Sequence, residues 1–153
     1  MEIVNSIKIF LRNLKWKLGI HQNFNNPHYS GIYGEWVGKN YLKKKGYRIH
    51  FKNWRSRRDR RNEIDLVCMD KKVLVFVEIR SRRENSLVTG YNSLNTRKRK
   101  ALLKSFKAFL KEESMECSTY RFDLVEVDLP QKFVNKPKVF HHENIAIFND
   151  SLH

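Results

Sequence analysis

Residues 62–83 read NEIDLVCMDKKVLVFVEIRSRR, and this stretch predicts the centre of the fold. Two apolar runs, Glu63 to Met69 and Val73 to Ile79, flank a short polar turn, a pattern that is typical of a β-hairpin. The second run is apolar at nearly every position, as expected of a central strand covered on both faces. Each run nevertheless contains a carboxylate, Asp65 in the first and Glu78 in the second. Because burying an unpaired carboxylate is costly, these two groups must be neutralised, paired or bound to a cation.

The turn of this hairpin decides how the two carboxylates lie. Side chains alternate along a strand, so Glu78 and Arg80 share one face. A two-residue turn, or a four-residue turn with Met69 opposite Leu74, places Asp65 on that face too, whereas a three-residue turn places it on the other. In the two favourable registers the β-carbons of the acids lie roughly 5 to 8 Å apart. Two carboxylates at this spacing can hold a hard cation such as Mg²⁺, whose ligands lie at about 2.1 Å.

The composition indicates a folded and strongly basic protein. A length of 153 residues suggests one domain with a real core, and 41% hydrophobic residues argue against a disordered chain. Lys and Arg number 31 against 16 Asp and Glu, which gives a formal net charge of +15. This excess makes a polyanion the expected partner, with nucleic acid ahead of an anionic membrane surface. A basic surface that is merely solvated is the alternative.

Several classes of protein are excluded by simple features. Cys68 and Cys117 form neither a zinc-binding pattern nor a disulfide framework, which fits reduced cysteines and a cytoplasmic location. No uninterrupted apolar stretch approaches the roughly 18 residues that span a bilayer. Lys8 and Arg12 interrupt what would be the apolar core of a signal peptide. A membrane therefore ranks below nucleic acid as a partner.

The first thirty residues predict an extension to the main domain. Apolar residues recur at helical spacing over residues 3–18, with basic residues between them, which indicates an amphipathic helix. This helix packs on the domain or on a partner, or else lies on a membrane surface. Residues 21–30 read as a linker. We therefore expect a helical extension and linker over residues 1–30 and the main domain over residues 31–153.

Two further helices are expected around the hairpin, over residues 32–45 and 93–112. Glu35, in the first of them, either forms a surface pair with Lys39 one turn later or leans over the hairpin as a third acidic group. The second begins with basic residues that oppose the helix dipole, so we expect an anion such as phosphate at its start. Its apolar residues, Leu94, Ala101, Leu102, Phe106, Phe109 and Leu110, should face the core.

Two more strands complete the predicted sheet. Residues 47–52 alternate Tyr47, Ile49 and Phe51 with polar residues, which predicts a half-exposed strand, and residues 121–129 form a further strand. An arginine-rich loop follows the first strand and should project into solvent or onto phosphates. Its arginines are Arg55, Arg57, Arg58, Arg60 and Arg61. Trp54 beside it is either a core or rim residue or a stacking platform for a base.

The order of these elements and their motifs resembles the bacterial YraN family, which is related to Holliday-junction resolvases and restriction-endonuclease-like nucleases. The matching motifs are Gly34-Glu35, Asn53-Trp54-Arg55, Glu63-Ile64-Asp65-Leu66, Phe76-Val77-Glu78-Ile79-Arg80, Lys98 and Arg121-Phe122-Asp123. They span roughly residues 31–148. The resemblance implies an α/β fold with a restriction-endonuclease-like, PD-(D/E)xK core: a central mixed sheet, containing an antiparallel hairpin, between flanking helices.

The resemblance also implies a function and a site. Glu35, Asp65 and Glu78 would surround one or two Mg²⁺ or Mn²⁺ ions in an endonuclease that acts on DNA, including branched or damaged DNA. Basic residues would follow the nucleic-acid backbone, namely Arg55, Arg57, Arg58, Arg60, Arg61, Arg82, Arg83, Arg97 and Lys98. Resolvase-like relatives often dimerise, so a homodimer is one expectation.

Arg80 departs from the family pattern. Relatives have a lysine that places the attacking water at this position, whereas an arginine is always protonated and cannot act as a base. Arg80 would either stabilise the charged transition state as part of the catalytic set, or pair with Glu78 and Asp65 and displace the metal. The second outcome corresponds to a catalytically inactive protein that keeps the nuclease fold and binds DNA or RNA.

Overall fold

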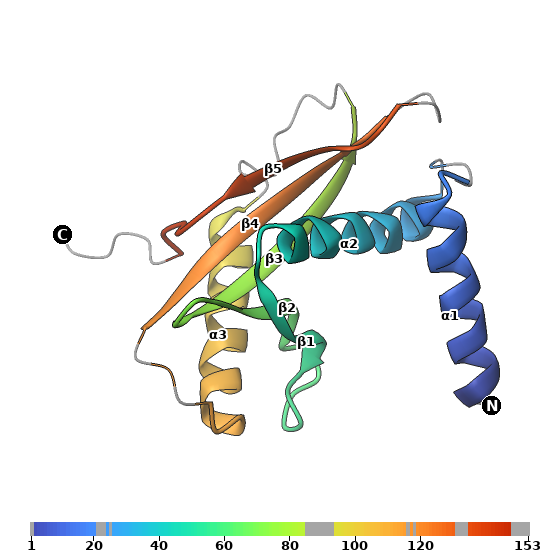
Figure 1. The fold of residues 1–153 in the computed structure, drawn as a ribbon. Coiled ribbons are helices and arrows are strands. Elements are labelled where there is room, and N and C mark those ends of the chain that lie inside the picture. Colours follow the sequence, from blue (N-terminus) through green and yellow to red (C-terminus); the bar gives the residue numbers. More distant parts are fainter. Residues whose placement is uncertain are drawn as a thin grey trace.

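The computed structural model describes residues 2–20, 24, 26–84, 94–115, 117, 119–130 and 135–147, with the backbone alone for residues 2–4. Their helices are α1 (Glu2–Lys17), α2 (Pro27–Lys44) and α3 (Thr96–Glu112), and their strands are β1 (Arg48–Arg55), β2 (Glu63–Asp70), β3 (Val73–Arg83), β4 (Thr119–Leu129) and β5 (Lys138–His142). The strands form a sheet in the order β1-β2-β3-β4-β5 (Figure 1). Only β3 and β4 are parallel among these neighbours. The expected mixed α/β architecture, a sheet flanked by helices, is confirmed.

Helices α2 and α3 cover opposite faces of the sheet (Figure 1). On the α2 face, Tyr33 and Leu42 belong to the same hydrophobic core as Val75 of β3. On the α3 face, Phe106 stacks on Phe76 with 4.4 Å between the ring centroids. Alternate residues of β3 therefore enter two different cores, which is why its sequence is apolar without a break. The prediction of a central strand is confirmed.

The register of the β2–β3 hairpin is the one predicted for a four-residue turn. Met69 lies opposite Leu74. Asp70 also pairs with Val73, so the turn itself contains only two residues. The same register sets Asp65 opposite Glu78, immediately beyond the last paired residues of the ladder. The two acids therefore meet where β2 begins to separate from β3.

Two glycines let α2 lie directly on β3. A β-carbon at Gly34 would come within 2.4 Å of the Ser81 β-carbon, and one at Gly38 within 3.1 Å of Ile79. A contact below 3.0 Å cannot be accommodated without moving the helix. This close approach brings Glu35, the neighbour of Gly34, against the hairpin.

Helix α2 begins earlier than expected. It starts at Pro27, and the Asn26 side chain accepts hydrogen bonds from the backbone N–H groups of His28 and Tyr29. The linker predicted over residues 21–30 is therefore wrong from Pro27 onward. The physical reason is that Asn-Pro, which also signals a turn, is a favourable pair for the N-cap and first position of a helix.

Strand β1 differs from its prediction because it contains a bulge. The register shifts between Ile49 and Phe51, so Ile49 packs on the α2 side, whereas the Phe51 ring lies 5.3 Å from that of Phe109 in α3. The predicted common face is therefore wrong. Trp54 is 7% exposed and contacts Phe109, and its Nε1 donates to Glu113. It is a core residue, and the base-stacking alternative is wrong.

Helix α3 and the C-terminal segment close the second core. Leu94, Leu102, Phe106 and Phe109 are buried, as predicted, but Ala101 is exposed, whereas Ser105 is buried. Ile145 and Ile147 join this core at 8% exposure each. The helix begins at Thr96, later than the expected start at Ser93, because the Asn95 side chain caps it by accepting from the Lys98 backbone N–H. Ser93 itself, and Phe148 of the apolar C-terminal patch, lie outside the described residues.

Helix α1 contacts the domain through one aromatic cluster. Trp16 is 4% exposed, and its Nε1 donates a 2.7 Å hydrogen bond to the Tyr29 hydroxyl. Its ring also lies 5.2 Å from that of Tyr33 and 5.4 Å from that of Trp36. None of the helices in the described part of the chain is both long and apolar enough to cross a bilayer.

Candidate active site

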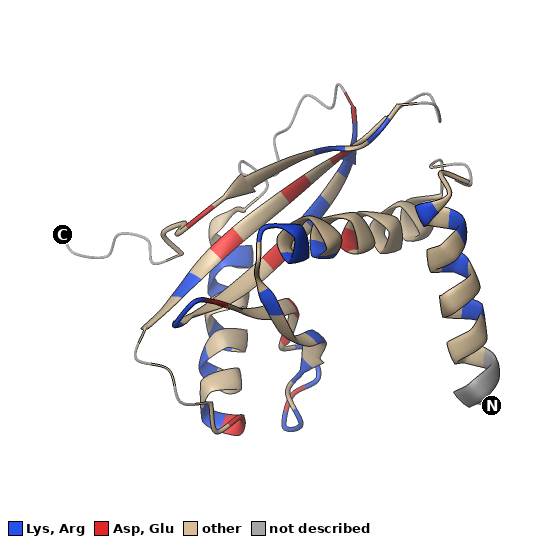
Figure 2. Cartoon of the chain, viewed as in Figure 1, with Lys and Arg blue, Asp and Glu red and all other residues tan. Residues whose placement is uncertain are grey.

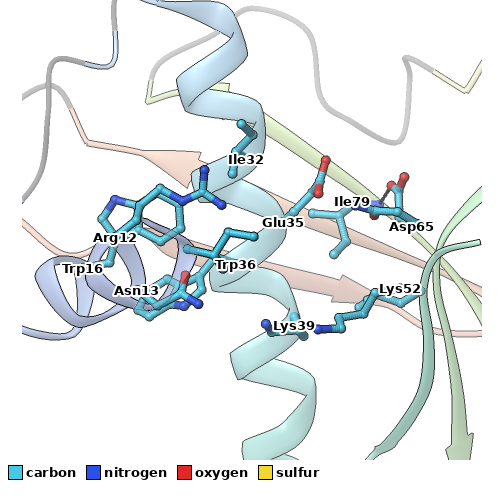
Figure 3. A pocket seen from close by; sticks show the side chains of 13 residues that line it. Arg12, Asn13, Trp16, Ile32, Glu35, Trp36, Lys39, Lys52, Asp65 and Ile79 are labelled. Carbon is cyan, nitrogen blue, oxygen red and sulfur yellow. Dashed lines mark hydrogen bonds between the residues drawn. The ribbon is translucent and has the colours of Figure 1, made fainter. Parts of the chain in front are cut away.

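A cavity of about 480 Å³ lies between α1, α2 and the first three strands. Asp65 and Glu35 form its acidic side, and Arg12, Lys39 and Lys52 contribute basic groups (Figure 3). The strands supply rigid positions for Asp65 and Lys52, and α2 supplies Glu35 and Lys39. The cavity therefore combines the acidic groups that bind a cation with the basic groups that bind a phosphate.

Asp65 is held at the point where the β2–β3 ladder ends. Its Oδ2 accepts a 2.7 Å hydrogen bond from the backbone N–H of Ile79, so the carboxylate takes the place of a strand carbonyl as acceptor. Burial, together with the charges of Glu78 and Glu35, raises the pKa of Asp65 to about 7, against the lowering effects of the bond from Ile79 and the charge of Lys98. The positive charge near Asp65 therefore offsets the cost of its ionised form only in part.

Glu78 reaches the same region from the side of α3. Its side chain is 5% exposed, and Oε1 lies 2.8 Å from Lys98 Nζ and 3.0 Å from Arg80 Nη2. Glu78 does not line the cavity that holds Asp65 and Glu35, but its charge acts on both of these acids. Glu78 is thus a buried carboxylate compensated by two cations.

Glu35 is tied to the strand β1. The Asn53 side chain donates a hydrogen bond to the Glu35 carboxylate, and burial raises the pKa of Glu35 above its ordinary value, as do the charges of Glu63 and Glu78. Asn53 has a φ of +49°, a left-handed conformation that asparagine tolerates. Within the described residues Asn53, and not Lys39, is therefore the partner of Glu35.

Two arginines carry buried donors without a partner. In the part of the chain that the structure describes, the Nε atoms of Arg12 and Arg80 find no hydrogen-bond acceptor. Arg12 lines the cavity, while Arg80 pairs with Glu78 through Nη2. An unsatisfied buried N–H costs free energy, so both guanidinium groups are suited to bind an anionic ligand as hydrogen-bond donors.

The acidic residues fit a cation only in part. No three His, Cys, Asp or Glu side chains among the described residues are arranged to hold a metal ion. Asp65 and Glu78 nevertheless offer the oxygen donors that Mg²⁺ prefers, and a cation would offset the charge that raises the pKa of Asp65. The pair that would hold a metal is therefore Asp65 and Glu78, and a third ligand role for Glu35 stays a prediction.

Most of the predicted nucleic-acid-binding residues have acidic partners. The pairs are Arg55 with Glu63, Arg57 with Glu112 and Glu113, Arg61 with Asp59, Arg82 with Glu126 and Asp128, and Lys98 with Glu78. The side chains of Arg57 and Arg61 are still 72% and 88% exposed, and surface ion pairs of this kind are weak. Arg58, Arg60, Arg83 and Arg97 are exposed. The exposed residues of this set therefore remain accessible to a phosphate backbone. Figure 2 shows where the Lys and Arg segments lie along the chain.

These basic residues gather at two separate places. The arginine-rich loop is fixed to the C-terminal end of α3, where Glu112 accepts from the Ser56 hydroxyl at 2.5 Å and from the Arg57 backbone at 2.8 Å. Lys98 lies near the other end of this helix, roughly 21 Å from Glu112 along the helix axis. At that end Lys98 and Arg99 already bind Glu78 and backbone carbonyls, so internal contacts explain part of the charge for which we expected an anion.

A second cluster of charged side chains joins β4 to β5. The Asp123 side chain is fully buried and accepts from Arg121 Nε at 2.9 Å, from the Asn144 backbone at 3.0 Å and from His141 Nε2 at 3.0 Å. Arg121 also donates to Tyr47 and Asp70. Burial acts to raise the pKa of Asp123, but these hydrogen bonds outweigh it and lower the pKa. The adjacent His142 lies instead 2.9 Å from Glu126, so the two histidines have different partners.

Sequence reasoning found the three acids but missed the basic wall of the cavity, which consists of Arg12, Lys39 and Lys52. These three residues and Asn53 were not singled out as site residues, because they lie on three separate elements. Asn53 had one usable signal, its place beside Trp54 and Arg55 in a motif that resembles the family. Lys39 is half-buried, and burial, with the charge of Lys52, lowers its pKa.

The comparisons with known proteins agree on one family. The sequence model of the uncharacterised protein family UPF0102 matches residues 34–127. The chain is 37% identical over 120 residues to a UPF0102 protein of Prosthecochloris aestuarii, covering 78% of this chain and 92% of the relative. It is 32% identical over 114 residues to one of Carboxydothermus hydrogenoformans, covering 74% and 92%. A UPF0102 protein of Pseudomonas aeruginosa is 39% identical over 89 residues, covering 58% and 69%.

Proposed function

The chain belongs to the uncharacterised protein family UPF0102, the YraN family, and from that premise we propose that it binds DNA and hydrolyses its phosphodiester bonds with Mg²⁺ or Mn²⁺. The proposal includes a restriction-endonuclease-like arrangement of the mixed sheet. The observation that carries it is the position of Asp65, a half-buried carboxylate with a raised pKa, opposite Glu78 at the end of the hairpin. Such a carboxylate is costly to keep without a cation, and perturbed acids cluster at functional sites.

The roles of the residues follow from their contacts. Asp65 and Glu78 would hold the cation, which when bound would polarise the scissile phosphate and lower the pKa of a water molecule. Lys98 and Arg80, both on Glu78, would add positive charge beside the phosphate. Arg12 lines the same cavity and would add positive charge beside an adjacent phosphate.

The DNA backbone would run over the basic wall of the cavity. Lys39 and Lys52 stand beside the acids, and burial and mutual repulsion lower the pKa of Lys39. A phosphate between these lysines would relieve that repulsion. The exposed arginines of the loop after β1 would contact the duplex further away. Glu35, hydrogen-bonded to Asn53, would orient this wall or complete the metal site.

One observation favours a second function, nucleic-acid binding without catalysis. Arg80 lies 3.0 Å from Glu78, where it already neutralises one of the two carboxylates that would hold the metal. A cation would have to compete with this guanidinium and with Lys98. In that case the fold and the basic surface would serve binding alone. Cleavage assays distinguish the two functions.

Replacing Arg80 by lysine tests the two functions directly. We expect Arg80→Lys to cleave linear, branched or single-stranded DNA at least about tenfold faster than the native protein with Mg²⁺ or Mn²⁺, because an ammonium frees one side of Glu78. Arg82→Lys is the matched control, since Arg82 follows on the same face of β3 and pairs with Asp128 instead. Metal-independent binding with no cleavage by either protein would favour the non-catalytic function.

The dependence of DNA affinity on salt tests the basic wall. We expect log Kd to rise steeply with log salt concentration, with a slope of about 0.9 for each phosphate neutralised. The double variant Lys39→Ala, Lys52→Ala should reduce that slope by about 1 to 2. Lys72→Ala, at the exposed turn of the hairpin, is the control and should leave it unchanged. A flat salt response of the native protein would exclude nucleic acid as the partner.

A further inference from the structure

Helix α1 turns its apolar stripe to solvent. The stripe recurs at helical spacing and consists of Ile7, Phe10, Leu11, Leu14 and Leu18, which are 42% to 67% exposed. A helix that packs on its own domain buries such a stripe. Instead, α1 buries Trp16 and half-buries Arg12 and Asn13. The stripe is therefore not used in the packing of the described chain.

The outward direction of the stripe is fixed by the contacts on the opposite side of α1. Trp16 packs edge-on against Tyr29 and Tyr33 and donates to the Tyr29 hydroxyl at 2.7 Å. The Arg12 guanidinium lies 5.0 Å from the centre of the Trp16 ring. Turning the stripe inward would break all of these contacts. The helix is anchored with a polar and aromatic side inward and an aliphatic side outward.

Basic residues border the stripe on both sides. At 100° per residue, Lys8 and Lys15 fall along one border of the stripe and Lys17 along the other. Residues 5–20 contain no Asp or Glu, and Figure 2 shows basic segments along α1. An aliphatic stripe between lysines is the pattern of a helix that lies in the plane of a membrane surface, where the lysine stems reach the headgroups.

We propose that α1 docks this protein on the surface of an anionic lipid bilayer. The stripe would enter the boundary between headgroups and acyl chains, and Lys8, Lys15 and Lys17 would contact lipid phosphates. A second copy of the chain is a poorer occupant, because two such helices would bring lysines together without acidic partners. Nucleic acid is also poorer, because the stripe offers phosphates nothing but Ile, Leu and Phe.

Vesicle flotation with the full chain tests this docking. We expect co-flotation with vesicles of phosphatidylglycerol and phosphatidylcholine, and at least about tenfold weaker binding to phosphatidylcholine alone. The variant Phe10→Ser, Leu14→Ser removes two anchors and should lower the affinity for anionic vesicles at least about tenfold. Phe140→Ser, an exposed aromatic of β5, is the matched control and should bind like the native protein.

Charge-reversal variants distinguish vesicle binding through α1 from vesicle binding through the rest of the basic surface. Lys8→Glu, Lys15→Glu, Lys17→Glu should abolish flotation, whereas Lys100→Glu, Lys107→Glu, Lys111→Glu on exposed positions of α3 should retain most of it. Because all six side chains are exposed, circular dichroism should report unchanged folding. Equal losses in the two triple variants would overturn the proposal. It would also be overturned if the Phe10→Ser, Leu14→Ser change abolished a dimer or weakened DNA binding, while the native protein failed to float.

Discussion

Asp65→Asn is expected to abolish metal-dependent cleavage of DNA and, at the same time, to raise the melting temperature of the metal-free protein. Cleavage should fall at least about a thousandfold, because asparagine removes a charge on which metal binding depends. Binding of DNA without metal should be nearly unchanged. The asparagine oxygen can still accept the hydrogen bond from Ile79, so the strand end keeps its geometry.

The gain in stability follows from the sign of the pKa shift. Asp65 has a pKa of about 7 in the folded protein, above its ordinary value of 3.8. The folded state therefore binds more protons than the unfolded state between these values, and Asp65 costs stability increasingly as the pH rises through this window. At pH 8 we expect Asp65→Asn to be more stable by about 1 to 2 kcal/mol after allowance for solvent screening.

Thermal melts at two pH values measure both effects. The advantage of Asp65→Asn should be small near pH 4 and full at pH 8, and Mg²⁺ or Mn²⁺ should raise the melting temperature of the native protein but not that of the variant. Asp59→Asn is the control and should have the opposite effect, since hydrogen bonds from Arg61 and Lys104 lower the pKa of that partly exposed carboxylate. If neither metal changed the melting temperature of the native protein, this result would contradict a cation site at Asp65.

The second large effect is expected at Asp123, and it is a loss of stability. Asp123→Asn leaves Arg121 without its buried counter-charge and weakens the bond to His141. We expect it to lower the free energy of unfolding by about 3 kcal/mol at pH 7, or the melting temperature by about 10 °C. Because Asp123 lies in the β4–β5 cluster, DNA binding by the folded variant should be unaffected.

The pH dependence at Asp123 is the reverse of that at Asp65. The pKa of Asp123 is lowered in the folded protein, so its contribution to stability is present above the ordinary value near 3.8 and is lost as the pH falls through the folded-state value. Urea unfolding at pH 7 and pH 3 should therefore show a large difference between native and variant only at pH 7. Asp70→Asn is the matched control, because Asp70 also pairs with Arg121 but is 32% exposed and should cost less than about 1 kcal/mol.

Parts of the candidate site could be predicted because they depend on local pattern. The spacing of apolar residues gave the β2–β3 hairpin, and alternation limited the position of Asp65 relative to Glu78 to a few registers. The basic wall could not be predicted in this way. Arg12, Lys39 and Lys52 come from α1, α2 and β1, and their meeting depends on how these elements pack.

The contrast between local sequence pattern and the packing of separate elements also explains which other features of the fold could be predicted. Sequence by itself determined the central strand and the placement of one carboxylate in each strand of the hairpin, because both follow from the periodicity of apolar residues. Tertiary structure alone decided that Arg80 and Lys98 converge on Glu78, that Trp54 is buried, and that α1 faces outward with its apolar stripe. The physical reason is that backbone periodicity fixes which residues share a face, whereas burial and charge pairing depend on partners distant in the chain.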